Sequence, residues 1–160
     1  MSPRSLQAEI QQGRPFRSPG HEGMVALLRT TTVVRRSLAR VVERAGITVA
    51  QFNVLRILRG AGPDGLPTLA IRDRLLEEAP GITRLLDKLE AAGLVRRDRC
   101  TPDRRQVICR ITERGLAMLA ELDAPVDALD DRAFATLEPE ELRELVRLLE
   151  RVRAAHGGAD

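Results

Sequence analysis

The sequence predicts a mainly α-helical fold with one small β-hairpin. Apolar residues recur at helical spacing along most of the chain. Two short β-like runs, residues 94–99 and 107–111, stand close together, and two short predicted helices directly precede them. This is the order of a winged helix-turn-helix, and longer predicted helices flank it on both sides. We therefore expect a winged helix-turn-helix with additional N- and C-terminal helices.

Composition narrows the function classes. The 160 residues suit one domain, and 43% hydrophobic with 31% charged residues is typical of a folded globular chain. Aromatic residues make up only 2%, with no Trp or Tyr, so a base-stacking platform for single-stranded nucleic acid is excluded. Duplex recognition does not need such rings.

Charge is unevenly distributed along the chain. Residues 84–114 carry 9 basic and 5 acidic groups, whereas residues 115–160 carry 5 basic and 11 acidic groups. A basic central block followed by an acidic tail is expected when one region contacts nucleic acid and another does not.

No segment suggests a membrane, a secretory route or a metal. The chain lacks a run of 18 apolar residues, and residues 1–18 are mostly polar. We expect a cytoplasmic protein with no membrane partner. Two cysteines and two distant histidines, His21 and His156, do not make a zinc site, so no cofactor is expected.

The N-terminal third predicts an arm and a long helix. Residues 1–20 lack a sustained period and contain Pro15 and Pro19, which indicates a flexible arm. Helical spacing then continues over residues 23–44 and ends before Gly46.

Two short helices follow. Thr48 and Gln51 have the capping-box spacing and open a helix over about residues 49–59. After a turn rich in glycine, Thr68 is positioned to cap a third helix over about residues 69–77.

The next helix has one apolar and one polar face. Pro80 is expected in its first turn and Gly93 at its end. The apolar stripe contains Ile82, Leu85, Leu86 and Leu89. The polar face contains Thr83, Arg84, Asp87 and Lys88. Such a helix can rest on the domain and present its polar face to the DNA major groove, although Lys88 could instead pair with Asp87 or Glu90.

Arginines mark the hairpin, and Cys100 and Cys109 flank its tip. Arg104 and Arg105 lie in the tip, where they can reach phosphates or the minor groove; Arg96, Arg97 and Arg99 could be solvated strand residues. With a loop of residues 103–106 the cysteines face each other; with a loop of residues 101–106 they are diagonal neighbours. A regulatory disulfide is one interpretation, and reduced thiols are the ordinary one in a cytosolic protein.

Two more helices complete the chain. Thr112 is expected to start a helix that runs to about residue 129 with a kink at Pro125. A last helix opens at Glu138 and Pro139 and carries the apolar stripe Leu142, Leu145, Val146, Leu149 and Val152. Apolar stripes outside a small winged core indicate a dimer interface.

Three motifs in this order resemble the MarR family of regulators. They are Ile82-Thr83-Arg84-Leu85-Leu86-Asp87-Lys88-Leu89-Glu90 with Gly93-Leu94-Val95, then Asp103-Arg104-Arg105, and then Ile111-Thr112-Glu113-Arg114-Gly115. The resemblance extends over about residues 24–153. It implies a homodimer that binds a pseudo-palindromic DNA duplex, with one wing for each half-site.

The resemblance also implies a domain layout. A single domain would cover residues 21–156, with the winged helix-turn-helix at about 48–112. Dimerisation helices would cover about 23–45 and 113–154.

Site residues follow from the resemblance and from position on the same elements. Thr83 and Arg84 match positions that approach bases or phosphates, Arg104 or Arg105 matches the minor-groove arginine, and Asp103 matches the acid that supports the wing. The full set of expected DNA-binding residues is Thr68, Pro80, Gly81, Thr83, Arg84, Lys88, Arg99, Arg104 and Arg105. The resemblance further implies a repressor released by a small aromatic or phenolic effector that binds between the dimerisation helices and the winged part.

Other functions have less support. The chain has no P-loop, dinucleotide-binding glycine pattern, zinc-protease motif or nucleophile elbow, so we expect no enzyme activity. A thiol-based redox regulator through Cys100 and Cys109 is one alternative. A winged-helix module that binds protein instead of DNA is another, since fold alone does not fix function.

Overall fold

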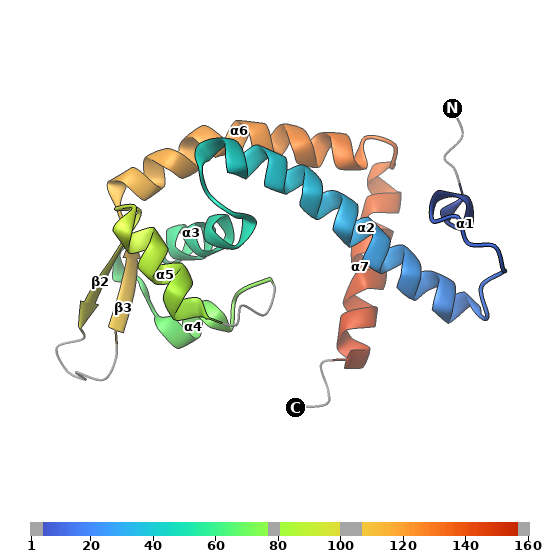
Figure 1. Ribbon diagram of the computed structural model, residues 1–160, viewed down its shortest axis with the longest axis horizontal. Helices are drawn as coiled ribbons and strands as arrows, with labels where there is room; N and C mark the ends of the chain where they lie inside the picture. The colour runs from blue at the N-terminus through green and yellow to red at the C-terminus, as the bar shows by residue number, and fades with distance from the viewer. Residues whose placement is uncertain (1–4, 77–80, 100–106, 157–160) are drawn as a thin grey trace. The chain divides into compact units, whose positions relative to one another are not determined.

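The structure is a computed structural model that describes residues 5–76, 81–99 and 107–156 (Figure 1). Helices predominate, with one small three-stranded antiparallel sheet, which confirms the predicted fold class. The chain divides into two compact units, Met1–Val49 and Ala50–Asp160. None of the helices in the described ranges is long and apolar enough to span a membrane.

The first unit contains α1 (Leu6–Glu9), α2 (Pro19–Val42) and the short 3-10 helix η1 (Glu43–Ala45). The Ser18 hydroxyl accepts a hydrogen bond of 3.1 Å from the His21 amide and caps α2. Because of this cap, α2 begins at Pro19 and not at residue 23, inside the segment expected to be an irregular arm.

The short helix α1 also lies in that segment. Arg29 Nε on α2 donates a hydrogen bond of 2.8 Å to Glu9 Oε1, so an ion pair joins the two helices. The far end of the unit agrees with the sequence pattern, because Gly46 has a φ of 77° and follows η1.

The second unit contains the predicted succession of short helices. They are α3 (Val49–Ala61), the 3-10 helix η2 (Gly62–Asp64), α4 (Thr68–Arg72) and α5 (Ile82–Ala91). The first residue of α3, Val49, is the last residue of the first unit. One face of α3 is buried through Phe52, Val54, Leu55 and Leu58. This confirms the helix expected over about residues 49–59.

Helix α4 is shorter than the expected span of 69–77. Beyond Arg72 the chain turns more tightly, since the amide of Arg74 bonds to the carbonyl of Ile71 and the amide of Leu75 to that of Arg72. Bonds between residues three apart close the last turn and end the helix. Helix α5 begins at Ile82 with Gly81 at its cap position. The expected place of Pro80 in the first turn lies outside the described residues.

The sheet has the strand order β1-β3-β2, formed by β1 (Leu66–Pro67), β2 (Val95–Arg99) and β3 (Val107–Ile111). Strands β2 and β3 form the predicted hairpin, in which Val95 pairs with Ile111 and Arg99 with Val107. Strand β1 was not anticipated. The close approach of β1 to β3 depends on Gly65, which has a φ of 70°. A Cβ at this position would lie 2.4 Å from the Cys109 carbonyl oxygen.

Two long helices follow the sheet: α6 (Glu113–Phe134) and α7 (Pro139–His156). The Thr112 hydroxyl accepts a hydrogen bond of 3.1 Å from the Gly115 amide, which confirms Thr112 as the start of α6. The helix continues through Pro125 to Phe134, beyond the expected end at residue 129.

A common apolar core holds the second unit together. It includes Leu55 and Leu58 of α3, Ile71 of α4, Leu86 and Leu89 of α5, Cys109 of β3, and Leu119 and Leu122 of α6. Helix α7 contributes no buried residue. Its apolar side chains Val146, Leu148 and Val152 are 48%, 42% and 43% exposed.

Candidate nucleic-acid interface

Helix α5 presents the polar face that the sequence predicts. Ile82, Leu86 and Leu89 are buried and fix the helix to the domain. Thr83, Arg84 and Lys88 are exposed. The helix therefore offers one hydroxyl and two cationic side chains to a partner while its opposite face is held in the core.

Gly81 forms the entry to this helix. It occupies the cap position with a φ of 101°, in the left-handed region, and no atom of the described residues lies within 4 Å of a Cβ built there. The backbone conformation, and not crowding, favours glycine at this position. The exposed glycine leaves the first turn of α5, with Thr83 and Arg84, open to approach.

Thr68 does not cap α4. The structure assigns Thr68 to the helix itself, and Pro67 occupies the cap position without a side-chain hydrogen bond. The Thr68 hydroxyl instead lies 3.8 Å from Cys109 Sγ, where either atom can donate. Thr68 is half-buried, and its expected contact with DNA stays a prediction.

Most of the predicted wing residues lie outside the described part of the chain. These are Cys100, Asp103, Arg104 and Arg105, together with Pro80 ahead of α5. Arg99 is the last residue of β2 and pairs with Val107 through the backbone. Their roles in binding stay predictions.

Sequence reasoning missed a link between the wing and α5. Arg97 of β2 donates a hydrogen bond of 2.9 Å from Nε to Glu90 Oε2, and its Nη2 lies 2.7 Å from Asp87 Oδ1. Its side chain is only 24% exposed. The alternation of side chains along β2 could have predicted this link. Arg97 shares a face with the buried Val95, and an arginine that points inward needs carboxylate partners.

The ion pair between Arg97 and Glu90 shifts the pKa values of both groups. The hydrogen bond from Arg97 lowers the pKa of Glu90 below its usual value, and the same bond raises the pKa of Arg97. Both groups therefore stay charged at neutral pH. Arg97 also forms an ion pair with Asp87. Both carboxylates that Lys88 could have paired with are therefore bound to Arg97, and Lys88 has no ion pair within the described residues.

Cys109 is fully buried in β3, and burial raises the pKa of its thiol. Its pairing partner in the hairpin is Arg97, and Arg99 pairs with Val107. This register differs from the pairing that either expected loop requires, and Cys100 itself lies outside the described residues. A buried thiol with a raised pKa is also a poor nucleophile.

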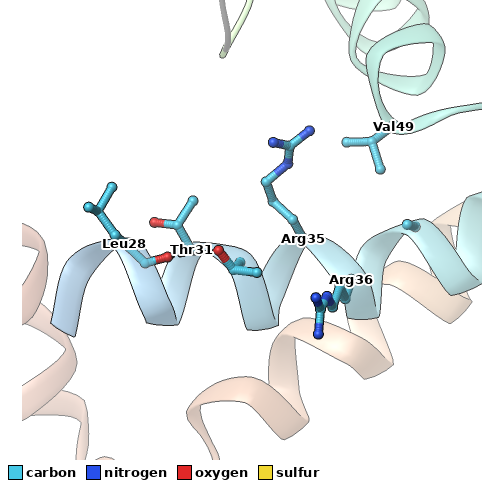
Figure 2. A pocket seen from close by; sticks show the side chains of 7 residues that line it. Leu28, Thr31, Arg35, Arg36 and Val49 are labelled. Atoms are coloured by element: carbon cyan, nitrogen blue, oxygen red, sulfur yellow. Dashed lines mark hydrogen bonds between the residues drawn. The ribbon is translucent and has the colours of Figure 1, made fainter. Parts of the chain in front are cut away.

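The first unit contains a pocket of about 450 Å³ along α2 (Figure 2). It is lined by Leu28, Thr31, Thr32, Arg35, Arg36, Ala39 and Val49. Figure 2 shows Leu28, Thr31 and Arg35 on one side of the helix, the side on which Val49 lies. The hydroxyls of Thr31 and Thr32 donate hydrogen bonds to carbonyls four residues earlier in the same helix. The other lining side chains are apolar or carry guanidinium groups.

Comparison with known proteins gives consistent results. A family model described as MarR family matches residues 45–106. An uncharacterised HTH-type transcriptional regulator of Bacillus subtilis, YkoM, is 34% identical over 107 residues, which are 66% of this chain and 68% of that protein. The crystal structure of a MarR transcription factor from Planctomyces limnophilus is 38% identical with a TM-score of 0.66, and covers 85% of this chain and 98% of its own. The chain belongs to the MarR family.

A third comparison adds a nucleic-acid complex. A mutant MarR of E. coli, solved with operator DNA, is 25% identical with a TM-score of 0.73, over 93% of this chain and 99% of its own. The MarR family is one of transcription regulators and not of enzymes. The exposed face of α5 and the hairpin are thus the elements to consider for DNA.

Proposed function

We propose that this MarR protein is a homodimeric transcription regulator that binds a pseudo-palindromic DNA duplex and performs no catalytic step. The observation that carries the proposal is the amphipathic α5, with Arg84 and Lys88 exposed beside a hairpin that is joined to it by Arg97. The similar E. coli protein was solved with operator DNA, which supports this interpretation. Such a regulator acts where the chromosome is, in the cytoplasm.

Helix α5 would enter the major groove. Residues at the start of a recognition helix contact base edges, and Thr83 and Arg84 hold that position here. A guanidinium can donate two hydrogen bonds to guanine, so Arg84 is our candidate for base recognition. Lys88, one turn later, is a candidate for phosphate.

The wing would contact the neighbouring backbone or minor groove. In this proposal Arg104 and Arg105 at the tip meet phosphates or minor-groove acceptors, Asp103 supports the tip, and Arg99 lies where β2 ends. The bond between Arg97 and Glu90 fixes the base of the wing against α5. Both contacts would then form in a single docking orientation.

Exposed apolar side chains on the terminal helices support the dimer. On α2, Met24, Leu28, Val33 and Val34 are between 43% and 61% exposed. On α6 and α7 the exposed apolar side chains include Phe134, Val146, Leu148 and Val152, and Leu137 lies in the turn between these helices. Side chains of this kind are stabilised by burial in a second copy.

We further propose that a small aromatic or phenolic effector releases the protein from DNA and so relieves repression. The pocket along α2 supports this, because Leu28, Ala39 and Val49 offer apolar surface and Arg36 offers a charged donor. Its volume of about 450 Å³ is in the range that ligand pockets have.

Selection of bound sites from random duplexes tests the proposal. The full-length protein should enrich one sequence with two inverted half-sites about one helical turn apart. A binding isotherm on that duplex should be steeply salt-dependent. Enrichment of no sequence at low salt would overturn DNA binding and favour a winged-helix module that binds protein.

A further inference from the structure

Arg110 of β3 joins the wing hairpin to the segment that precedes α4. Its Nε donates a hydrogen bond of 3.0 Å to the Pro63 carbonyl in η2, 47 residues earlier in the chain. Its Nη1 donates a hydrogen bond of 2.8 Å to Asp98 Oδ2 in β2. One guanidinium therefore holds both neighbours of β3, namely β2 and the segment that leads into β1. We call these two bonds the Arg110 bridge.

The chain leaves room for this side chain at Gly65. A Cβ at Gly65, just before β1, would lie 2.6 Å from Arg110 Cγ. The Arg110 side chain is only 26% exposed, so the surrounding atoms restrict its position. Glycine at residue 65 thus allows the stem of Arg110 to pass close to the backbone on its way to Pro63.

Backbone pairing alone holds β1 weakly to β3. Strand β1 contains two residues, Leu66 and Pro67, which pair with Cys109 and Ile108. Proline has no amide proton, so Pro67 cannot donate a hydrogen bond to β3. A hydrogen bond from a charged donor is stronger than one between neutral groups. The bond from Arg110 to Pro63 is therefore a large part of the attachment at this edge of the sheet.

The Arg110 bridge lies on the face of the hairpin opposite to Arg97. Side chains alternate along β2, so Arg97 bonds to Glu90 of α5 whereas Asp98 bonds to Arg110. One face of the hairpin is thus held to α5, and the other face is held to the segment before α4. Contacts on both faces oppose rotation of the hairpin about the strand direction.

We propose that Arg110 is a positioning residue for DNA recognition, because its bridge sets the angle at which the wing meets the duplex. This inference rests on the proposed function, in which Arg104 and Arg105 contact the backbone or minor groove. The planar guanidinium serves Pro63 and Asp98 at the same time, whereas the single ammonium of a lysine does not offer this fork.

Hydrogen exchange of the DNA-free, full-length protein tests the bridge itself. Arg110→Gln should accelerate amide exchange in residues 62–68 and in β3 about tenfold, because hydrogen bonds from a charged group are lost on both sides of β3. Arg110→Lys keeps the charge and should not restore slow exchange. Arg96→Gln is the matched control, since Arg96 pairs with Arg110 across the strands and is 65% exposed. It lies 3.7 Å from Asp98, too far for a hydrogen bond, so this variant should exchange as the wild type does.

Hydroxyl-radical footprinting on the selected duplex tests the positioning. At saturating concentration the wild type should protect the half-sites and the flanking backbone that the wing contacts. Arg110→Gln and Arg110→Lys should bind about tenfold more weakly and, once saturated, should protect the half-sites but not the flanks. Arg96→Gln should protect both. A role in stability alone would lower the active fraction of protein and leave the pattern of protection unchanged.

The possible outcomes separate this role from the proposed function. The proposal is overturned if Arg110→Gln retains the exchange rates or the flank protection of the wild type. It is also overturned if Arg96→Gln behaves as Arg110→Gln does, since loss of charge would then explain both. A wild type that leaves the flanks unprotected contradicts the wing contact of the proposed function. A wild type that protects them, with an unchanged Arg110→Gln, removes only the role of Arg110.

Discussion

Arg97 Nη2 lies 2.7 Å from Asp87 Oδ1, so a strand of the wing and the helix beside it share an ion pair. Glu90 accepts a second bond from the same guanidinium. Asp87 and Glu90 belong to the helix that we propose to enter DNA, where free carboxylates would repel phosphates. The guanidinium therefore fixes the wing to the helix and offsets one of the two negative charges.

Replacing Arg97 with Gln should weaken binding to the selected duplex about tenfold, equivalent to about 1.4 kcal/mol. The charge of Asp87 and Glu90 would then be uncompensated beside the phosphates. The double variant Arg97→Gln with Glu90→Gln should recover part of the affinity, which a double-mutant cycle by fluorescence anisotropy would measure. Arg143→Gln on α7 serves as the control, and equal affinity of Arg97→Gln and wild type would contradict this role.

Gly115 should be intolerant of a side chain. A Cβ there would lie 2.4 Å from the Leu94 carbonyl oxygen and 2.7 Å from Ile111 Cγ1, in the close approach of α6 to the sheet. Gly115→Ala should lower the free energy of unfolding by roughly 1–3 kcal/mol. Gly23→Ala is the matched control in α2, where no atom lies within 4 Å, and should stabilise by about 0.5–1 kcal/mol. Urea unfolding checks both, and a neutral Gly115→Ala would show that the two segments separate easily.

Most of the helices and the hairpin could be predicted from the sequence. Periodicity, caps and breakers located α2, α3, α5, the hairpin, α6 and α7, because burial of one face determines these elements locally. The polar face of α5 followed from the same pattern. The end of α4 and the position of β1 did not, since Leu66 and Pro67 pair with Cys109 and Ile108, far along the chain.

The misassigned residues share this cause. Thr68 has the residue type and position of a cap, yet its hydroxyl lies beside Cys109, a contact created by the pairing of β1 with β3. The cross-strand partner of Cys109 depended on the hairpin register, which spacing alone left open by several residues. Long-range pairing, and not local propensity, settles such details.

The dimer should depend on the exposed apolar side of α7. Val146→Asp with Val152→Asp places two charges where we expect burial, so the variant should have a monomer mass by light scattering at micromolar concentration. It should also lose binding to the selected duplex, although neither residue is expected to contact DNA. Glu150→Gln on the same helix is the control and should remain dimeric. A wild-type protein that is monomeric throughout this range would contradict the assembly.

Cys109 should be nearly inert in the folded protein. Its thiol is fully buried with a raised pKa, so little thiolate is available to react. In a Cys100→Ser background, where Cys109 is the one remaining thiol, modification by an aromatic disulfide reagent should be slow and should accelerate in urea. Peroxide should leave duplex affinity unchanged. Fast modification of the native protein with a reversible change in affinity would restore the redox alternative.

In the proposed complex α5 reads bases while the wing holds the backbone or minor groove. The most direct test of this mechanism is the salt dependence of binding to the selected duplex and to a scrambled one, for wild type, Arg84→Ala, and Arg104→Ala with Arg105→Ala. Arg84→Ala should cost roughly 1–3 kcal/mol on the selected duplex and relax preference at one base position. The double wing variant should weaken binding to both duplexes, with a salt slope reduced by about 1 for each phosphate that it no longer neutralises. If the double wing variant binds both duplexes as wild type does, the wing does not touch DNA and the proposed mechanism is wrong.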